Sequence, residues 1–389
     1  MIHINCEIDS STNKITAKSN LGDIHYIFPF EKLPMLETYD FVVWGFLPIA
    51  MRLGKDIYIE GVVSTKTIES ANEISSIWAN WLPNIYQSIS IKARKILDVS
   101  MPIEHEKHLT FFSGGIDSTY SSYKSYLKNG KDSDCLTVHG MDYKFDDSEK
   151  FDALFRQTEE FRKMVFDRSR VIKTDAYSLY SRYGCNPKGG HVTHIFSLFS
   201  CGSLFEEYSQ YRIAADYRLD QQFAVHPYGS NTASNRMMQN FKGSLITLDD
   251  DITRSQKTTY LSQSELDLST LSICVNYKFR PKNCGKCSKC MRTKAMFYAQ
   301  NNSIPDVFAD MSFNEGWHSS ISLTTKINRA FVQDILFTVE KSQNQHTFPD
   351  YEKLKLKFLL ATQRAAVNPF YGMKLKDLVR AVFKMLLKY

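Results

Sequence analysis

Long apolar runs are missing from this chain, and none reaches the roughly 20 residues that a membrane-spanning helix needs. The first residues, MIHINCEIDSSTNKI, contain neither a basic nor an apolar segment, so no secretory signal peptide is expected. Internal repeats and low-complexity segments are also absent from the sequence. These absences favour a cytoplasmic location and exclude a repeat architecture.

Neither sign of charge dominates: 48 lysines and arginines stand against 42 aspartates and glutamates, for a net charge of +6. This mild basic excess favours anionic ligands, but it is too small to indicate nucleic-acid binding. Disulfides are not expected in the cytosol, so the eight cysteines are read first as thiols or metal ligands. A length of 389 residues with 43% hydrophobic content predicts two or three globular domains.

Residues 1–104 predict an N-terminal α+β domain without a visible reaction centre. The pattern gives three short strands within 1–28, a helix at 41–54, a strand at 57–63, a helix at 67–87 and a strand at 88–97. We expect Pro48 to kink or end the first helix and Thr65 to cap the second.

Residues 105–308 predict an α/β domain, because strands and helices alternate there. Apolar strands are expected at 109–113, 135–142, 169–177 and 211–217, with helices at 117–130 and 151–166. This alternation implies a parallel sheet with helices on both faces. Residues 309–389 predict a helical C-terminal region. Its last segment, 374–389, is amphipathic, which fits docking on its own protein, a partner helix or a membrane surface.

The stretch LTFFSGGIDSTYSSY, residues 109–123, joins an apolar run to a polar run through two adjacent glycines. In a parallel sheet such a turn lies at the carboxyl edge, where ligands bind. Gly114 and Gly115, after Ser113, let the backbone approach a ligand closely, and their N–H groups with the following helix form an anion site. Ser118 adds a hydroxyl, and Asp117 indicates a Mg²⁺ ion that bridges to phosphates.

The string SGGIDS resembles the pyrophosphate-binding loop of the PP-loop ATP pyrophosphatase superfamily, whose fold is adenine nucleotide alpha hydrolase-like. That family splits ATP between the α and β phosphates and adenylates a carbonyl or carboxyl oxygen. The resemblance implies that residues 113–118 hold the pyrophosphate of ATP, with Asp117 and Ser118 in catalytic roles. The alternative is a plain strand–turn–helix junction in which Asp117 and Ser118 act only as helix caps.

A second motif, CVNYKFRPKNCGKCSKCMRT, covers residues 274–293. Its four cysteines, Cys274, Cys284, Cys287 and Cys290, fit a closed tetrahedral zinc site. Without an open coordination position, such a metal is structural. An iron–sulfur cluster also uses four cysteines, and four unligated thiols are a further alternative.

Together the two motifs are similar to those of the 7-cyano-7-deazaguanine synthases and their relatives. The resemblance implies an ATP-dependent C–N ligase that activates a 7-deazaguanine-type acid, or another carboxylate, for attack by ammonia or an amine. This chain has an N-terminal domain and a C-terminal region that those synthases lack, which indicates a specialised pathway. Anti-phage defence, polysaccharide synthesis and natural-product synthesis are the alternatives left open. Either extra part is a candidate site for a protein partner, and a homodimer stays open.

Other strand ends supply further candidates. In the family the second strand end holds adenine, which places His139 and Gly140 there by resemblance. Candidate substrate residues are His191 and His194, expected one helical turn apart, then Gly229, Ser230 and Arg292. Packed histidines, an ordinary turn at 226–231 and a surface arginine are the alternatives.

Two other classes of function remain open from the sequence. A sulfur-transfer enzyme of the same superfamily needs a cysteine free of metal, and Cys185 and Cys201 are the candidates. A nucleotide-binding module without turnover would instead use the extra domains to hold a protein partner.

Overall fold

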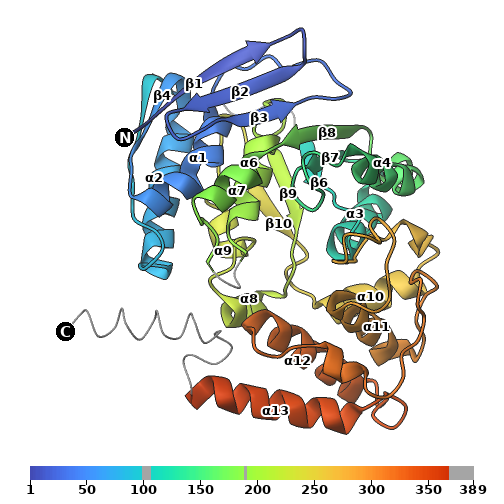
Figure 1. Cartoon of the computed structure of the whole chain (residues 1–389). Helices are drawn as coiled ribbons and strands as arrows, with labels where there is room; N and C mark the ends of the chain where they lie inside the picture. The colour runs from blue at the N-terminus through green and yellow to red at the C-terminus, as the bar shows by residue number, and fades with distance from the viewer. Residues whose placement is uncertain (99–106, 188–190, 368–389) are drawn as a thin grey trace. The chain divides into compact units, whose positions relative to one another are not determined.

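The computed structural model describes residues 1–98, 107–187 and 191–367 (Figure 1). The chain forms two compact units. The first contains residues 1–252 and 269–273, and the second contains 253–268 and the chain from Cys274 onward. These units do not follow the predicted domain boundaries near residues 104 and 308. The amphipathic segment 374–389 lies outside the described residues.

The first unit is built on one sheet of ten strands. The strands are β1 (Ile2–Asp9), β2 (Lys14–Ser19), β3 (Ile24–Ile27), β4 (Ile57–Ser64), β5 (Ile91–Leu97), β6 (His108–Phe111), β7 (Asp134–His139), β8 (Ser169–Thr174), β9 (Gln210–Ala214) and β10 (Ser244–Leu248). Their order across the sheet is β10-β9-β6-β7-β8-β3-β2-β1-β4-β5. The four strands predicted beyond residue 105 are confirmed, whereas β10 was missed.

Strands β6 to β10 pair in parallel throughout. The chain starts in the middle at β6, moves to β7 and β8 on one side, and then returns to β9 and β10 on the other. This is the strand order of a Rossmann-like sheet, and its topological switch point lies between β6 and β9. The expected α/β class with a mostly parallel sheet is therefore confirmed.

The N-terminal strands extend the same sheet instead of forming a separate one. β1, β2 and β3 form an antiparallel meander, and β4 and β5 add parallel strands beyond β1. The two halves meet where β3 pairs antiparallel with β8, with Tyr26 opposite Thr174. The predicted boundary near residue 104 therefore falls within one compact unit.

Helices cover both faces of this sheet. In Figure 1, α1, α6 and α7 lie on one side, and α3 and α4 lie on the other. The helices of this unit are α1 (Asp40–Leu53), α2 (Thr65–Trp81), α3 (Ile116–Asn129), α4 (Ser148–Gln157), α5 (Glu159–Val165), α6 (Ala176–Arg182), α7 (Thr193–Gly202), α8 (Leu219–Val225) and α9 (Thr232–Asn235).

Of the two outcomes expected at Pro48, an end of the helix was wrong, since α1 continues to Leu53. Two further local expectations were wrong. Ser64 caps α2 in place of Thr65, because its hydroxyl accepts the Thr67 N–H. The helix expected at 151–166 is interrupted at Thr158, whose hydroxyl donates to the Leu154 carbonyl.

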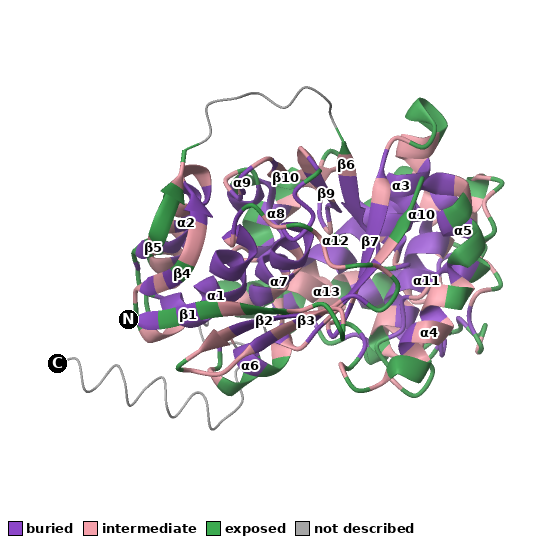
Figure 2. Ribbon diagram, turned by 90° about the horizontal axis from the view of Figure 1, so that it is seen from above, coloured by how far each residue is buried: buried purple, intermediate pink, exposed green. Residues whose placement is uncertain are grey.

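The centre of the first unit joins residues from both halves of the sequence. Helix α1 is buried over most of its length (Figure 2). Its Trp44 ring packs edge-on against Phe199 of α7, with 5.2 Å between ring centroids. Ser200 of α7 donates to the Phe41 carbonyl at 2.7 Å. Removal of the N-terminal half would therefore expose the core face of α7.

The second unit is helical and has its own core. It contains α10 (Arg254–Gln263), α11 (Ser288–Asn301), α12 (Lys326–Lys341) and α13 (Tyr351–Val367). Phe313, Trp317 and Phe348 form an aromatic cluster within it. The helix-rich character predicted beyond residue 309 is confirmed for the described part. Among the described residues, no helix combines the length and apolar character that crossing a membrane requires.

Candidate functional site

The glycine loop lies between β6 and α3, as predicted. Gly115 precedes α3 in an extended conformation, and Gly114 has φ of +72°. A Cβ at Gly114 would lie 3.1 Å from Cγ2 of Thr158. Both the left-handed backbone and the close neighbour therefore require glycine at this position.

Two serines hold the loop in shape. The hydroxyl of Ser118 lies 3.2 Å from that of Ser113 and also accepts the Ser113 N–H at 3.3 Å. The Gly114 carbonyl accepts the N–H of Ser272 at 2.8 Å, which fixes the other side of the turn. Within the described residues, the Gly114 N–H donates no backbone hydrogen bond. This donor and the start of α3 are available to an anion.

The position of the loop in the sheet favours ligand binding. β6 is the strand beside the switch point, and the loop leaves its carboxyl end. Asp117 lies in the first turn of α3 and is half-buried. A carboxylate at this place fits a divalent cation shared with phosphate better than it fits phosphate alone. The five residues predicted for the loop are thus brought together in one turn.

His139 and Gly140 have structural roles at the end of β7. The His139 ring stacks on Phe151 at 4.4 Å, and Nε2 lies 2.7 Å from the Lys144 carbonyl oxygen. Burial lowers the pKa of His139. A Cβ on Gly140, which has φ of +113°, would lie 1.7 Å from the Thr174 carbonyl oxygen. The His139 side chain is therefore packed within the fold, and the adenine contact that the resemblance implies for these two residues stays a prediction.

The candidate substrate residues at 191–194 and at 229–230 lie next to each other. The Gly229 N–H donates to the His191 carbonyl at 2.8 Å, and a Cβ on Gly229 would lie 2.3 Å from the Val192 carbonyl oxygen. His194 contacts Tyr228, with 5.4 Å between ring centroids. The loop 226–231 is therefore packed on the start of α7.

The expected helical pair of histidines is not formed. Helix α7 begins at Thr193, so His191 precedes it and is exposed, whereas His194 lies in its first turn. Asn186 blocks a continuation of the helix, because its side-chain oxygen accepts the N–H groups of both Val192 and Thr193 at 3.0 Å. The two imidazoles therefore differ in environment.

Both ring nitrogens of His194 are buried and have no hydrogen-bond partner among the described residues. Burial lowers the pKa of His194 to about 4, although the negative charges of Asp216 and Asp142 act in the opposite direction. The imidazole is therefore neutral at physiological pH. Ser230, which is 1% exposed, likewise has a hydroxyl without a partner among these residues.

Asp142, Asp216 and Tyr228 were missed by the sequence reasoning. Asp142 follows the end of β7, and Asp216 follows the end of β9 and accepts the Tyr228 hydroxyl at 2.7 Å. Their positions just past strand ends were a usable signal, since such residues share the carboxyl edge of a parallel sheet.

Arg292 packs inside the second unit. Its guanidinium carbon lies 3.9 Å from the centre of the Phe331 ring, and Nη1 donates to Asn328 at 3.0 Å. Arg212 of the first unit pairs with Asp132 at 2.8 Å. Both arginines thus have partners within their own units.

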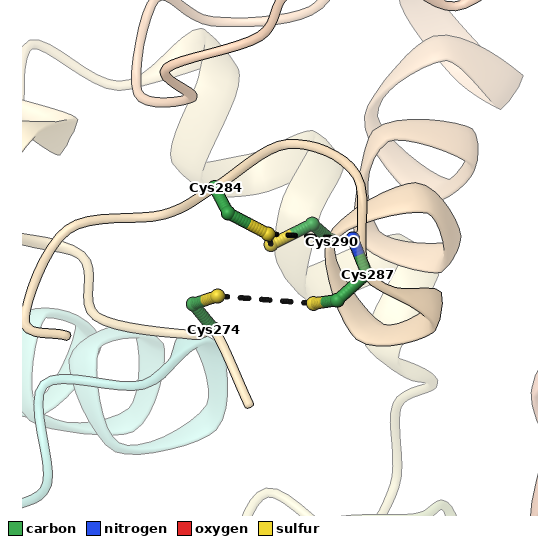
Figure 3. Close-up of side chains that lie close together, drawn as sticks. All are labelled: Cys274, Cys284, Cys287 and Cys290. Atoms are coloured by element: carbon green, nitrogen blue, oxygen red, sulfur yellow. Dashed lines mark hydrogen bonds between the residues drawn. The ribbon is translucent and has the colours of Figure 1, made fainter. Parts of the chain in front are cut away.

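The four predicted cysteines form one cluster at the start of α11 (Figure 3). Their sulfur atoms all lie within 4.8 Å of one another. Sγ of Cys274 lies 3.8 Å from that of Cys287, and Sγ of Cys284 lies 3.9 Å from that of Cys290. Four sulfurs about 2.3 Å from a central zinc are about 3.8 Å apart, so the cluster is a candidate metal site.

Backbone geometry around the cluster supports this assignment. The N–H groups of Lys286 and Cys287 donate to Sγ of Cys284 at 3.4 and 3.3 Å. Such bonds stabilise thiolates and orient metal ligands. Gly285 has φ of +74°, and a Cβ there would lie 2.0 Å from the Asp310 carbonyl oxygen. Glycine is therefore required in this turn.

The metal-free cysteines proposed for sulfur transfer lie in the core. Both Cys185 and Cys201 are fully buried. Burial raises the pKa of Cys185 to about 12 and raises that of Cys201 as well. Neither thiol has the exposure or thiolate character that a nucleophilic cysteine needs.

Comparisons of the chain with known protein families, with curated proteins and with solved structures found no match in any of the three. The function is therefore argued from motifs and geometry.

Proposed function

We propose that this chain is an ATP-dependent adenylating enzyme of the PP-loop type, which forms AMP and pyrophosphate while activating a carboxylate. Ammonia or an amine then displaces AMP, which gives an amide. The observation that carries the proposal is the SGGIDS loop at the carboxyl end of β6, beside the switch point of a parallel sheet. A 7-deazaguanine-type acid is the first substrate to test.

The loop residues support this chemistry through their geometry. The Gly114 N–H and the start of α3 would bind the pyrophosphate, with Ser118 holding the turn in place. Asp117 would hold Mg²⁺, which when bound neutralises charge on the leaving pyrophosphate. The requirement for glycine at position 114 fits a backbone that approaches phosphate closely.

We further propose that the cysteine cluster holds a structural zinc ion. The sulfur separations and the N–H groups directed at Cys284 support zinc. Zinc would fix the chain between Cys274 and the start of α11, which the sequence alone leaves as a long polar loop.

The test is an incubation with Mg²⁺, α-labelled ATP and 7-carboxy-7-deazaguanine, with and without ammonia, followed by separation of the nucleotides. We expect AMP that depends on the acid and disappears in Asp117→Asn. Formation of ADP would contradict the proposal. ATP binding without AMP, with any acid tried, would favour the nucleotide-binding module without turnover. AMP formation that requires Cys185 or Cys201 would favour sulfur transfer.

A further inference from the structure

The most unusual polar group in the first unit is the imidazole of His194. A buried nitrogen without a partner costs about 1–3 kcal/mol, and His194 has two such nitrogens among the described residues. Packed histidines elsewhere in the unit differ: Nε2 of His139 lies 2.7 Å from the Lys144 carbonyl, and Nδ1 of His25 lies 2.7 Å from Asp175. A ring left in this state is prepared for a ligand.

The neighbours of His194 lie at the sheet edge that carries the glycine loop. Asp142 follows β7 and Asp216 follows β9, and β6 lies between these two strands. His194 contacts Tyr228, whose hydroxyl donates to Asp216, so the imidazole is connected to the end of β9, the strand next to β6. The glycine loop leaves the sheet at the carboxyl end of β6.

The groups around His194 favour a ligand that donates hydrogen bonds. Among the described residues, the titratable groups that act on His194 are Asp216, Asp142 and His191. Carboxylate oxygens and the lone pair of a neutral imidazole accept hydrogen bonds, which an amine donates and an ionised carboxylate does not. Tyr228 keeps Asp216 in place through a 2.7 Å bond, and the neutral ring offers a lone pair to an N–H donor.

We propose that His194, with Asp142 and Asp216 beside it, binds the amine nucleophile of the ligation and accepts its proton. This inference rests on the proposed function. The amine nitrogen attacks the acyl carbon, a C–N bond forms, and the C–O bond to AMP breaks, with its electron pair leaving on AMP. The proton released from nitrogen passes to the free ring nitrogen of His194 and then to solvent.

The test follows the ring nitrogens of ¹⁵N-histidine-labelled full-length protein by NMR during titration with ammonium chloride or methylamine. Signals are assigned with His194→Gln and His25→Gln. We expect the His194 signals to shift with both probes, or with ammonium alone if ammonia is the nucleophile. Tetramethylammonium, which has no N–H, should leave them in place. His25, already bonded to Asp175, is the internal control.

Unchanged His194 signals, or equal shifts with tetramethylammonium, would overturn the proposal. If His194→Gln does not fold, Asp216→Asn gives the second test and should weaken binding of the amine at least about threefold. The titration needs no ATP. The titration can therefore show no amine binding while AMP formation is normal. Failure of the amine-binding inference is thus distinguishable from failure of the proposed adenylating activity.

Discussion

The carbonyl oxygen of Thr174 lies 1.7 Å from the point that a Cβ on Gly140 would occupy. Thr174 also pairs with Tyr26 of β3, so this contact lies where β7, β8 and the N-terminal half of the sheet meet. The absence of a side chain at position 140 lets the ends of β7 and β8 approach each other. The glycine thus belongs to the framework of the sheet.

Gly140→Ala should therefore lower the free energy of unfolding by about 3 kcal/mol, because positive φ and a backbone clash both oppose alanine. Gly184→Ala is the matched control. Gly184 has φ of +59° with nothing within 4 Å of its Cβ position, so about 1 kcal/mol is expected. Urea unfolding measures both, and equal losses would contradict the steric argument.

Ser118→Ala should raise the KM for ATP about tenfold in the AMP-forming assay, since the loop loses its bonds to Ser113. Ser121→Ala is the control on the same helix. Its hydroxyl is buried and has no partner among the described residues, so its removal should leave KM unchanged. An unchanged KM in Ser118→Ala would show that these bonds do not shape the ATP site.

The protein as purified should contain about one zinc per chain, as a closed four-cysteine site requires. Cys284→Ser should lose most of this metal and lower the stability of the second unit. Cys135→Ser, which changes a buried cysteine of the first unit, should keep it. Atomic emission measures the content. Iron with visible absorption would instead indicate an iron–sulfur cluster.

His194 should make stability depend on pH. Its folded-state pKa, lowered by burial to about 4, is below the unfolded value, so the folded protein binds fewer protons between these two values. The contribution is fully present above about pH 6.5 and is lost as the pH falls toward 4. Between about pH 7.5 and pH 5 the loss is on the order of 2 kcal/mol. His194→Gln should remove this part of the slope in urea unfolding, and identical slopes would contradict it.

Residues 107–389 alone should fail to fold, because their sheet and α7 need the N-terminal half as a partner. We expect aggregation or binding of a hydrophobic dye. Co-expression with residues 1–98 should restore a soluble complex. A stable, monomeric 107–389 fragment would support the separate N-terminal domain that the sequence predicted.

The parts of the fold that depend on local pattern could be predicted. The turn at residues 113–118 and the cysteine turn at 284–290 have signals within a few residues, and both lie where they were expected. The pairing of β3 with β8 could not be predicted, because the two strands are some 150 residues apart and no local sequence pattern indicates which strands pair. Strand β10 is short and only partly buried, so its pattern was weak.

The candidate site residues show the same difference between local patterns and long-range contacts. His191 and His194 were expected one helical turn apart, but the helix begins only at Thr193. Asn186 stops the helix, and that contact is visible only in three dimensions. Asp142 and Asp216 follow strand ends, which is a local signal, but their positions on either side of β6 depend on strand order, which no local pattern predicts.

The packing of α1 against α7 has a consequence for how the chain is made. Twelve of the residues in α1 are buried, and much of this burial depends on α7, which begins about 140 residues after α1 ends. At ribosomal rates of about 5–20 residues per second, α1 leaves the ribosome on the order of ten seconds before its partner exists. During that interval its apolar face has no native cover, so we expect the nascent chain to present a binding site for chaperones.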